Sequence, residues 1–426
     1  MQRKGNIMKH SAFERLPKKL TISFPMWMIY ATKGEYSPYY DIDKVMREHV
    51  ERGFNCMRID SGAGVMHDLS GSLREPFEMT DMFGDYERIP RQQHMLGDGG
   101  KCDLLGRLIK LFSSAKEHGI YVILSQWYYL HTYWFQKAGD PVCDELFALP
   151  PEKRFDAFKI FWHYILLELE KRELDGQIAY VEVFNEADDH PFLCGENGRW
   201  GSIRDIPDAE AEFYRKQHDD AITWLRERHP SILFAYDNTT VDGAEKNMPG
   251  SAQIYSFHSY YMWSLYNDAL KGHDEWFKHR ITPEDVKKSR EGRRPTGEDW
   301  YQRVAQFNDL DYSYLPEIEK SLEETFIQNK ETYAAKRDRS LDLAVKLAGD
   351  KMPIVMGEGV SYICSKKILW EEKSEQYWQF VKEGLARFKE KNVWGTVIRT
   401  CCGPEDPCWD MCADKLLELN KFFLED

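Results

Sequence analysis

The chain has 426 residues, 42% of them hydrophobic and 14% aromatic, enough to bury one large core or two to three smaller ones. Its formal net charge is −14 and no block of Lys and Arg dominates, which argues against nucleic acid or an anionic membrane as a partner. The longest apolar stretches, around residues 24–30 and Val355, are too short to span a bilayer. No apolar signal segment follows the basic start, and nine dispersed cysteines do not form a secreted disulfide framework, so we expect a cytoplasmic protein.

Eight predicted strands follow one another along the chain, and amphipathic helices separate most of them. The predicted strands cover residues 20–30, 55–60, 120–127, 179–186, 232–238, 254–260, 353–359 and 394–400. The predicted helices cover residues 41–52, 104–118, 151–174, 208–228, 341–348, 374–391 and 413–424. Three helices are followed by a residue that suits a C-cap, namely Gly53, Gly119 and Asn392.

Strict alternation of strands and helices predicts parallel strands with right-handed crossovers. Eight such units favour the α/β fold of a single (β/α)8 TIM barrel over an open doubly wound sheet. No Gly-x-Gly-x-x-Gly follows the first strand, so the sequence gives no sign of a dinucleotide cofactor, and we expect no cofactor. Without repeats or a convincing linker, we expect one domain over residues 1–426.

Two connections are too long for ordinary strand-to-helix loops. They are insertions at about residues 61–100, after the second strand, and 261–339, after the sixth. Both leave the carboxyl ends of strands, where a barrel carries its active site, so we expect them to shape a pocket or a lid. The alternative for the second insertion is a contact between copies of the chain in a homo-oligomer, or a helical excursion.

Two glutamates, Glu186 and Glu358, each close an apolar, β-branched run that is typical of a buried strand. A carboxylate at the carboxyl end of a barrel strand is in the position of a catalytic residue. Two such carboxylates favour glycoside hydrolysis, in which a retaining pair stands about 5 to 5.5 Å apart and an inverting pair roughly 6.5 to 9.5 Å apart. The fourth and seventh strands face each other across the barrel mouth, so this pair is geometrically feasible.

The residues around the two glutamates resemble those of clan A glycoside hydrolases, particularly the cellulase-like glycoside hydrolase family 5. Asn185-Glu186-Ala187 is similar to the Asn-Glu-Pro signature at the end of the fourth strand. The resemblance implies that Glu186 is the acid/base, that Asn185 contacts the sugar 2-hydroxyl and that Glu358 is the nucleophile. A carboxyl that alternates between acid and base benefits from a raised pKa while its neighbour is ionised.

Three further positions match the family and imply substrate or nucleophile contacts. His258 and Tyr260 repeat the family's His-x-Tyr at the end of the sixth strand, with the Tyr hydroxyl donating to the nucleophile. Arg58 resembles the Arg that closes the second strand and pairs with the nucleophile, which would favour the ionised carboxylate. The alternative for Arg58 is a structural ion pair with Asp60 or Glu182, since Glu182 points into the barrel on the same face as the acid/base.

Two family positions do not match. Ser125-Gln126-Trp127 stands where the third strand usually ends in His, and Trp394 lies at the beginning of the eighth strand instead of near its end. The aromatic floor of the sugar site must then come from elsewhere. We expect Trp127 and Trp263 to bind substrate, with Tyr362 and Trp409 as further candidates for the floor.

The cluster from Cys401 to Cys412 contains four cysteines, but its spacing matches no common zinc knuckle. A turn-rich loop is the favoured reading, and we expect no metal. The residues together predict a retaining glycosidase that acts on β-linked oligosaccharides or glycosides. The alternative, motivated by the two mismatched positions, is a cellulase-like carbohydrate-binding protein without turnover.

Overall fold

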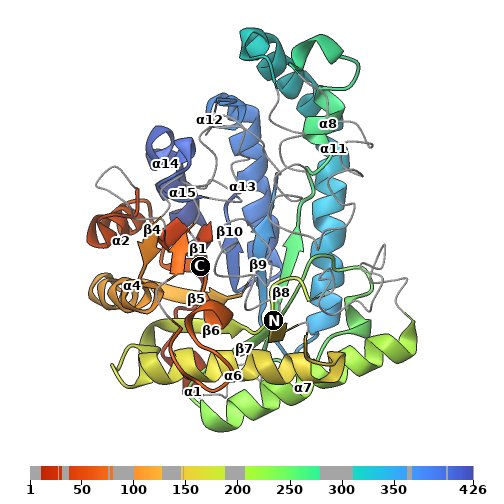
Figure 1. Cartoon of the computed structure of the whole chain (residues 1–426). Coiled ribbons are helices and arrows are strands. Elements are labelled where there is room, and N and C mark those ends of the chain that lie inside the picture. Colours follow the sequence, from red (N-terminus) through yellow and green to blue (C-terminus); the bar gives the residue numbers. More distant parts are fainter. Residues whose placement is uncertain are drawn as a thin grey trace.

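Eight parallel strands close into a barrel with helices around it, and this confirms the predicted (β/α)8 fold (Figure 1). The computed structural model describes residues 11–26, 28–30, 38–74, 77–79, 100–126, 145–146, 148–187, 207–278, 310–361, 367–399 and 402–425. The strands hydrogen-bond in the closed order β1-β10-β9-β8-β7-β6-β5-β2. Their bounds are β1 Leu20–Met26, β2 Cys56–Asp60, β5 Tyr121–Ser125, β6 Ile178–Glu182, β7 Phe234–Asn238, β8 Ile254–Ser259, β9 Ile354–Gly359 and β10 Gly395–Val397.

Every predicted strand is present, but several are shorter than predicted. The first ends at Met26 and is followed by a 3-10 helix over Met28–Tyr30. The fourth ends at Glu182, and residues 183–187 turn away from the sheet. Glu186 there has a left-handed φ of 53°, a conformation that a strand cannot hold. The turn therefore separates Glu186 from the strand that leads to it.

The helices pack around the outside of the barrel (Figure 1). Their bounds are α1 Ser11–Glu14, α2 Ile42–Glu51, α4 Leu104–His118, α6 Pro151–Glu170, α7 Asp208–Arg228, α12 Trp370–Lys373, α13 Glu375–Glu390, α14 Pro407–Met411 and α15 Ala413–Leu424. Aspartate and serine side chains cap the first turns of α2, α4 and α13. The left-handed residues predicted to end three helices, Gly53, Gly119 and Asn392, all have positive φ.

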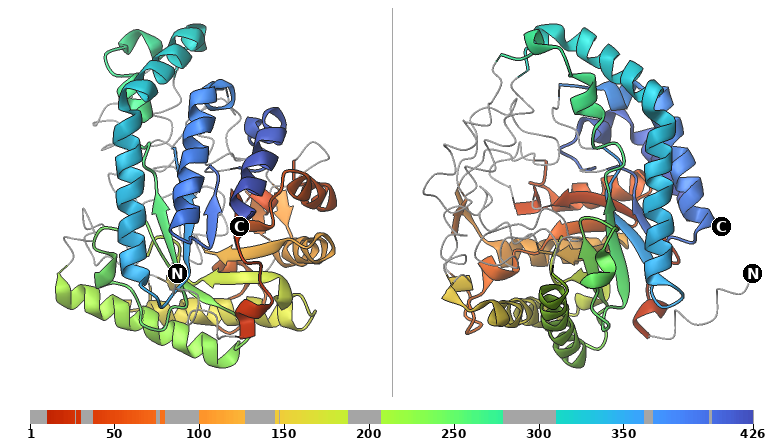
Figure 2. Two further views of the ribbon diagram at one scale, coloured as in Figure 1. Left: turned by 180° about the vertical axis from the view of Figure 1, so that it is seen from behind. Right: turned by 90° about the vertical axis from the view of Figure 1, so that its right-hand side faces the viewer.

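Both insertions contain regular structure that the sequence did not predict. The first holds α3 Ala63–Met66 and a two-stranded antiparallel sheet of β3 Phe77–Met79 and β4 Gly100–Cys102. The second holds α8 Leu265–Ala269 and 3-10 turns, followed by α11 Leu315–Ala348. The helix predicted over residues 341–348 is the end of this 34-residue helix, which runs along the outside of the barrel (Figure 2).

The two ends of the barrel differ in chemistry. At the amino end of the strands the contacts are aromatic and backbone: Trp394 packs near Tyr180 and donates to the carbonyl of Pro17. Arg15, after α1, donates to the carbonyls of Gly176 and Ser231. The carboxyl end instead carries fully buried charged side chains, so the functional site is sought there.

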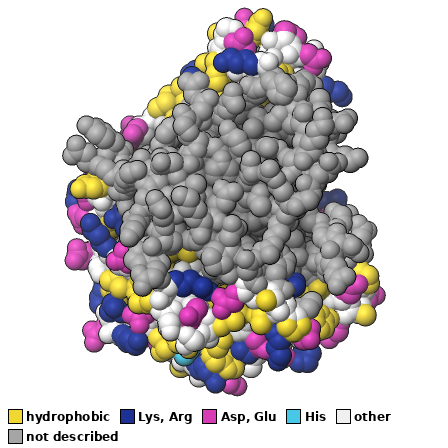
Figure 3. All heavy atoms as spheres, in the orientation of Figure 1, with side chains coloured by type: hydrophobic (Ala, Val, Ile, Leu, Met, Phe, Trp, Pro, Cys, Tyr) yellow, Lys and Arg dark blue, Asp and Glu magenta, His cyan; other side chains and the backbone are white. Residues whose placement is uncertain are grey.

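Among the helices that the structure describes, none is both long and apolar enough to cross a membrane. The described surface over α6 and α7, at the lower edge of Figure 3, mixes acidic and basic side chains.

Candidate active site

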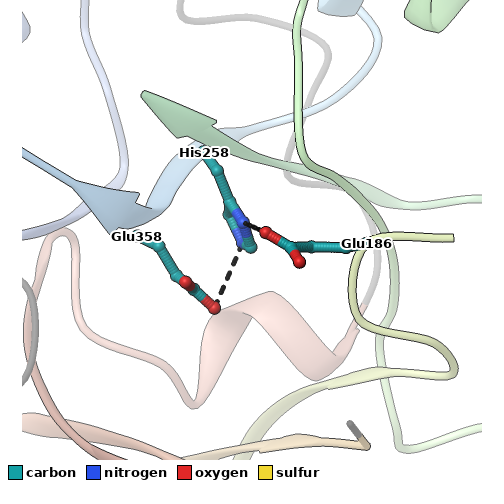
Figure 4. A group of neighbouring side chains, drawn as sticks. All are labelled: Glu186, His258 and Glu358. Carbon is teal, nitrogen blue, oxygen red and sulfur yellow. Dashed lines mark hydrogen bonds and ion pairs between the residues drawn. The ribbon is translucent and has the colours of Figure 1, made fainter. Parts of the chain in front are cut away.

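Three barrel strands and the turn that follows a fourth bring the predicted site residues together. Arg58 comes from β2, His258 from β8 and Glu358 from β9, while Glu186 follows β6. One ligand atom each from Glu186, His258 and Glu358 lies within 4.8 Å of the other two (Figure 4). The imidazole of His258 lies between the two carboxylates. The predicted pair therefore does converge at one point of the carboxyl face.

Arg58 makes both of the contacts that the sequence left as alternatives. Its Nη1 donates to Glu358 Oε1 at 2.6 Å, and its Nε and Nη2 donate to Glu182 Oε2 at 2.9 and 2.6 Å. Nη2 also donates to Asn185 Oδ1 at 2.7 Å. The guanidinium is fully buried, so it neutralises charge that water does not reach.

Glu358 is held by donors on both of its oxygens. Besides Arg58 on Oε1, the hydroxyl of Tyr260 donates to Oε2 at 2.5 Å, as the resemblance implied. Burial raises the pKa of the Glu358 carboxyl above its ordinary value, and the charges of His258 and Arg58 oppose that rise. The donors thus favour an ionised, fixed carboxylate in a site from which water is largely excluded.

A register shift in β9 aligns this carboxylate with His258. Phe257 pairs with Met356, but His258 pairs with Glu358, so Gly357 is the extra residue of a bulge. A Cβ atom on Gly357 would stand 2.7 Å from Ser256 Oγ, which explains why the bulge carries glycine.

Glu186 is held through its side chain and its backbone. His258 Nδ1 lies 2.8 Å from Glu186 Oε1, and the backbone N–H of Glu186 donates to Asp237 Oδ1 at 2.9 Å. The adjacent Asn185 is fully buried; among the described residues, its Nδ2 has no hydrogen-bond partner. A buried amide of this kind needs an acceptor, which a bound ligand can supply.

Asp237 is a site residue that the sequence interpretation missed. It lies in β7, and Ser256 Oγ donates to its Oδ2 at 2.7 Å while His258 Nε2 stands 3.0 Å from the same oxygen. The signal was available, because Asp237 closes an apolar run, Ile232-Leu-Phe-Ala-Tyr, as both glutamates do. Burial alone would raise the pKa of Asp237, but His258, Arg58 and the Glu186 N–H outweigh it and hold the pKa below its usual range.

The surroundings of His258 favour the charged form of its imidazole. Burial alone would lower its pKa, but the carboxylates of Asp237 and Glu358 outweigh burial and hold the pKa well above its ordinary value. We call Arg58, Glu182, Glu186, Asp237, His258 and Glu358 the Arg58 cluster.

Of the aromatic side chains expected to bind substrate, the structure describes Trp263. Its side chain is 52% exposed and meets the ring of Tyr260 edge to face, with centroids 5.6 Å apart. An exposed ring beside Tyr260 is suited to stack on a sugar. Trp127 and Tyr362 lie outside the described residues. Trp409 is wrong as a floor candidate, because it is buried in α14 and packs on Arg52.

In place of the missing histidine, Gln126 supports the loop after β2. Its Oε1 accepts from Ser61 Oγ at 2.9 Å and from the N–H of Ala63 at 2.6 Å, and its carbonyl accepts from the N–H of Asn185 at 3.1 Å. Gln126 thus links this loop to the turn that carries the acid/base candidate.

A second buried arginine lies beyond the end of β10. Arg399 contacts Glu371 at 2.8 Å, Glu372 at 2.9 Å and Asp406 at 3.5 Å, and we call these four residues the Arg399 cluster. The segment that the sequence marked as a turn-rich loop is a turn over residues 403–406 followed by α14. Its cysteines Cys402, Cys408 and Cys412 are buried and free, whereas Cys401 lies outside the described residues.

Two groups of side chains are close enough to hold a metal ion in the described part of the chain. One is Glu186, His258 and Glu358; the other is Glu372, Asp406 and Cys408. In the first, Arg58 and Tyr260 already donate to both oxygens of Glu358. In the second, Arg399 already pairs with both carboxylates. Protein donors thus occupy positions that a cation would take, and the absence of a metal stays a prediction.

Comparison with known proteins agrees with this geometry. The model of a cellulase-like family, described as sugar-binding cellulase-like, matches residues 26–404. The chain belongs to this cellulase-like family. No curated protein matches the sequence.

Several solved structures share the fold of this cellulase-like protein. A candidate glycoside hydrolase from Parabacteroides distasonis is 19% identical with a TM-score of 0.63, over 96% of this chain and 94% of that chain. A glycoside hydrolase family 5 enzyme from Prevotella bryantii is 13% identical with a TM-score of 0.52, over 98% and 100% of the two chains. A broad-specificity endoglucanase of the same family from Clostridium longisporum is 11% identical with a TM-score of 0.51, over 97% and 99%. The protein therefore shares its fold with these glycoside hydrolases.

Proposed function

We propose that the protein is a retaining glycoside hydrolase that cleaves β-linked oligosaccharides or glycosides, with Glu358 as nucleophile and Glu186 as acid/base. The observation that carries the proposal is the approach of the two carboxyl groups, whose nearest oxygens lie within 4.8 Å of each other. An inverting pair needs roughly 6.5 to 9.5 Å to admit a water, so the spacing favours retention.

In the first step, a Glu358 oxygen attacks the anomeric carbon and the bond from that carbon to the leaving oxygen breaks. Glu186 gives its proton to the leaving oxygen. Arg58 and Tyr260 donate to Glu358, which keeps the attacking carboxylate oriented toward the sugar. The product of this step is a glycosyl ester on Glu358.

In the second step, the Glu186 carboxylate takes a proton from water while the water oxygen attacks the anomeric carbon. The ester bond breaks and Glu358 leaves as a carboxylate. His258 contacts Glu186 Oε1 in the resting site, so it can stabilise the charge that appears on Glu186 between the steps. The Nδ2 hydrogens of Asn185, which have no partner among the described residues, suit a contact to the sugar 2-hydroxyl.

The test is intact-mass spectrometry after incubation with activated 2-deoxy-2-fluoro glycosides of glucose, mannose, galactose and xylose, followed by peptide mapping. We expect a stable adduct on Glu358 with one or more of these sugars. An adduct on another residue would refute the assignment of the nucleophile.

Two variants complete the test. Glu358→Gln should abolish turnover of aryl β-glycosides and adduct formation with the fold intact, whereas Glu418→Gln, a surface glutamate, should change neither. Glu186→Ala should lose turnover and regain part of it with azide, which replaces water without needing a general base. Near-wild-type activity of Glu358→Gln would refute the proposal.

A second candidate is a carbohydrate-binding protein without turnover. Two observations favour it: the description of the family as sugar-binding, and Ser125-Gln126 where the family resemblance leads one to expect a catalytic histidine. Calorimetric binding of a cello- or manno-oligosaccharide with no product after long incubation would select this candidate.

A further inference from the structure

One side chain outside the expected catalytic set contacts the backbone of the acid/base residue and also the histidine that faces its carboxyl group. Asp237 Oδ1 accepts the backbone N–H of Glu186 at 2.9 Å. Asp237 Oδ2 faces His258 Nε2 at 3.0 Å, and the other ring nitrogen of that histidine faces the carboxyl of Glu186 at 2.8 Å. A single buried carboxylate therefore reaches the backbone of Glu186 directly and its side chain through one ring.

The backbone contact is made where the chain is strained. Glu186 has a φ of 53°, a left-handed conformation that is strained for a non-glycine residue. Such a conformation persists when surrounding contacts determine it. The bond from the Glu186 N–H to Asp237 is one such contact, and it sets the direction in which the Glu186 side chain leaves the turn.

The side-chain contact fixes the orientation of His258. His258 Nε2 forms an ion pair with Asp237 Oδ2 at 3.0 Å, which holds the ring with Nδ1 facing Glu186 Oε1 at 2.8 Å. In the charged ring Nδ1 donates to Glu186 in either state: to the carbonyl oxygen of the protonated carboxyl and to the carboxylate. Ser256 Oγ donates to the same Asp237 oxygen at 2.7 Å and keeps it in place.

We propose that Asp237 is a positioning residue for acid/base catalysis, holding Glu186 by its backbone and orienting His258 as the hydrogen-bond partner of the Glu186 carboxyl. This inference rests on the proposed role of Glu186. It adds β7 to the strands β2, β6, β8 and β9 that carry or lead to the proposed active-site residues. It also explains why a fully buried aspartate lies in β7.

The charged groups facing Asp237 come from four elements. They are Arg58 of β2, whose Nη2 is 3.7 Å away, His258 of β8, Glu182 of β6 and, through His258, Glu358 of β9. Removing the negative charge of Asp237 leaves the two cations with fewer anions nearby, so the charge on His258 becomes less favourable.

The test separates acid catalysis from general structure by the choice of leaving group. A phenolate leaving group needs protonation by Glu186, whereas 2,4-dinitrophenolate leaves without it. We expect Asp237→Asn to lower kcat/KM for a phenyl glycoside by about 10- to 100-fold and to change kcat/KM for the dinitrophenyl glycoside by less than about threefold. Both substrates carry the sugar that labels Glu358.

Ser256→Ala is the matched control, because it removes one hydrogen bond to Asp237 and keeps the carboxylate. It should change kcat/KM for the two glycosides by the same small factor. An equal loss on both glycosides for Asp237→Asn would overturn the proposal and leave a structural aspartate.

A second measurement does not depend on turnover. Imidazole nitrogen resonances of His258, assigned by their disappearance in His258→Gln, should show both nitrogens protonated at pH 7 in the wild type. In Asp237→Asn they should show a neutral ring. Unchanged resonances would overturn the inference even if the enzyme is active. If the wild type turns over no glycoside, the proposed function fails, while this readout still decides whether Asp237 controls His258.

Discussion

Two buried arginines lie at the carboxyl end of the barrel, and each has three carboxylates within 4.0 Å. Those of Arg58 come from the barrel strands β6, β7 and β9, namely Glu182, Asp237 and Glu358. Those of Arg399 come from the short helix α12 and the N-cap of α14, namely Glu371, Glu372 and Asp406. The composition is nearly the same, but only the Arg58 cluster includes an imidazole between two carboxylates.

The comparison shows that a buried arginine with acidic partners does not by itself mark an active site. The ion pairs of the Arg399 cluster link the segment that follows β9 to the segment that follows β10, which is a structural role. The Arg58 cluster draws its groups from separate strands, which fix them in relation to one another, and its acid/base candidate retains 9% exposure. The following predictions test this division.

We expect the largest effect from Arg58→Met, which should reduce turnover. Loss of the cation leaves Glu358 and Glu182 without their shared donor, so kcat/KM should fall by about 10³-fold or more. Arg58→Met combined with Glu182→Gln restores the buried charge balance and should recover stability but not activity. Activity within tenfold of the wild type in either variant would show that Arg58 is not needed for the proposed reaction.

The next effect is on stability, from Arg399→Met. Three buried carboxylates lose their cation, which should lower the free energy of unfolding by about 3–5 kcal/mol in denaturant titrations. Turnover of the protein that remains folded should stay within about threefold of the wild type. A folded variant with strongly reduced kcat would break the comparison, because the Arg399 cluster would then belong to the active site.

The pH dependence should also distinguish the clusters. Glu358 attacks only when ionised, and its pKa lies above the ordinary value of 4.5, so kcat/KM should fall as the pH drops through that raised pKa. Tyr260→Phe removes a hydrogen-bond donor that favours the ionised form of Glu358. The pKa of Glu358 should then rise further, and the acidic limb of the profile of kcat/KM against pH should move to higher pH. Arg399→Met should leave the limb in place. A limb that moves to lower pH in Tyr260→Phe would contradict the role of this hydroxyl.

The smallest effect concerns substrate affinity, from Trp263→Ala. Loss of one exposed stacking ring should cost about 1 kcal/mol, or roughly a fivefold rise in KM, with kcat little changed. Ile327→Ala removes a comparably exposed side chain from α11 and should leave KM unchanged. A large fall in kcat for Trp263→Ala would mean that the ring supports Tyr260 instead of the sugar.

The barrel itself was predictable from the sequence, because strands buried on both faces leave continuous apolar runs that helices interrupt. The elements that were not predicted have weaker patterns in the local sequence. β3 and β4 are three residues each, too short for a pattern. Most of α11 was assigned to an insertion because its apolar residues, such as Ile318 and Phe326, are widely spaced among charges.

The site was partly predictable for the same reason. Six residues were placed by resemblance, and the structure brings them together, namely Arg58, Asn185, Glu186, His258, Tyr260 and Glu358. Asp237 was missed because it lies inside the predicted strand over residues 232–238 and matches none of the motif positions of the resemblance. That Arg58 bonds Glu182 and Glu358 at once could not be deduced, since no pattern along the chain gives the distance between three separate strands.

The closing seam of the barrel bears on how the protein is made. β1 hydrogen-bonds β10, so that Leu20 stands opposite Gly395, almost the whole length of the chain away. During synthesis the edge of β1 that pairs with β10 stays unpaired until β10 leaves the ribosome. The edge meanwhile offers its unpaired N–H and C=O groups to any other extended chain. Slow translation should therefore lengthen the interval in which the nascent protein depends on chaperones, however stable the finished barrel is.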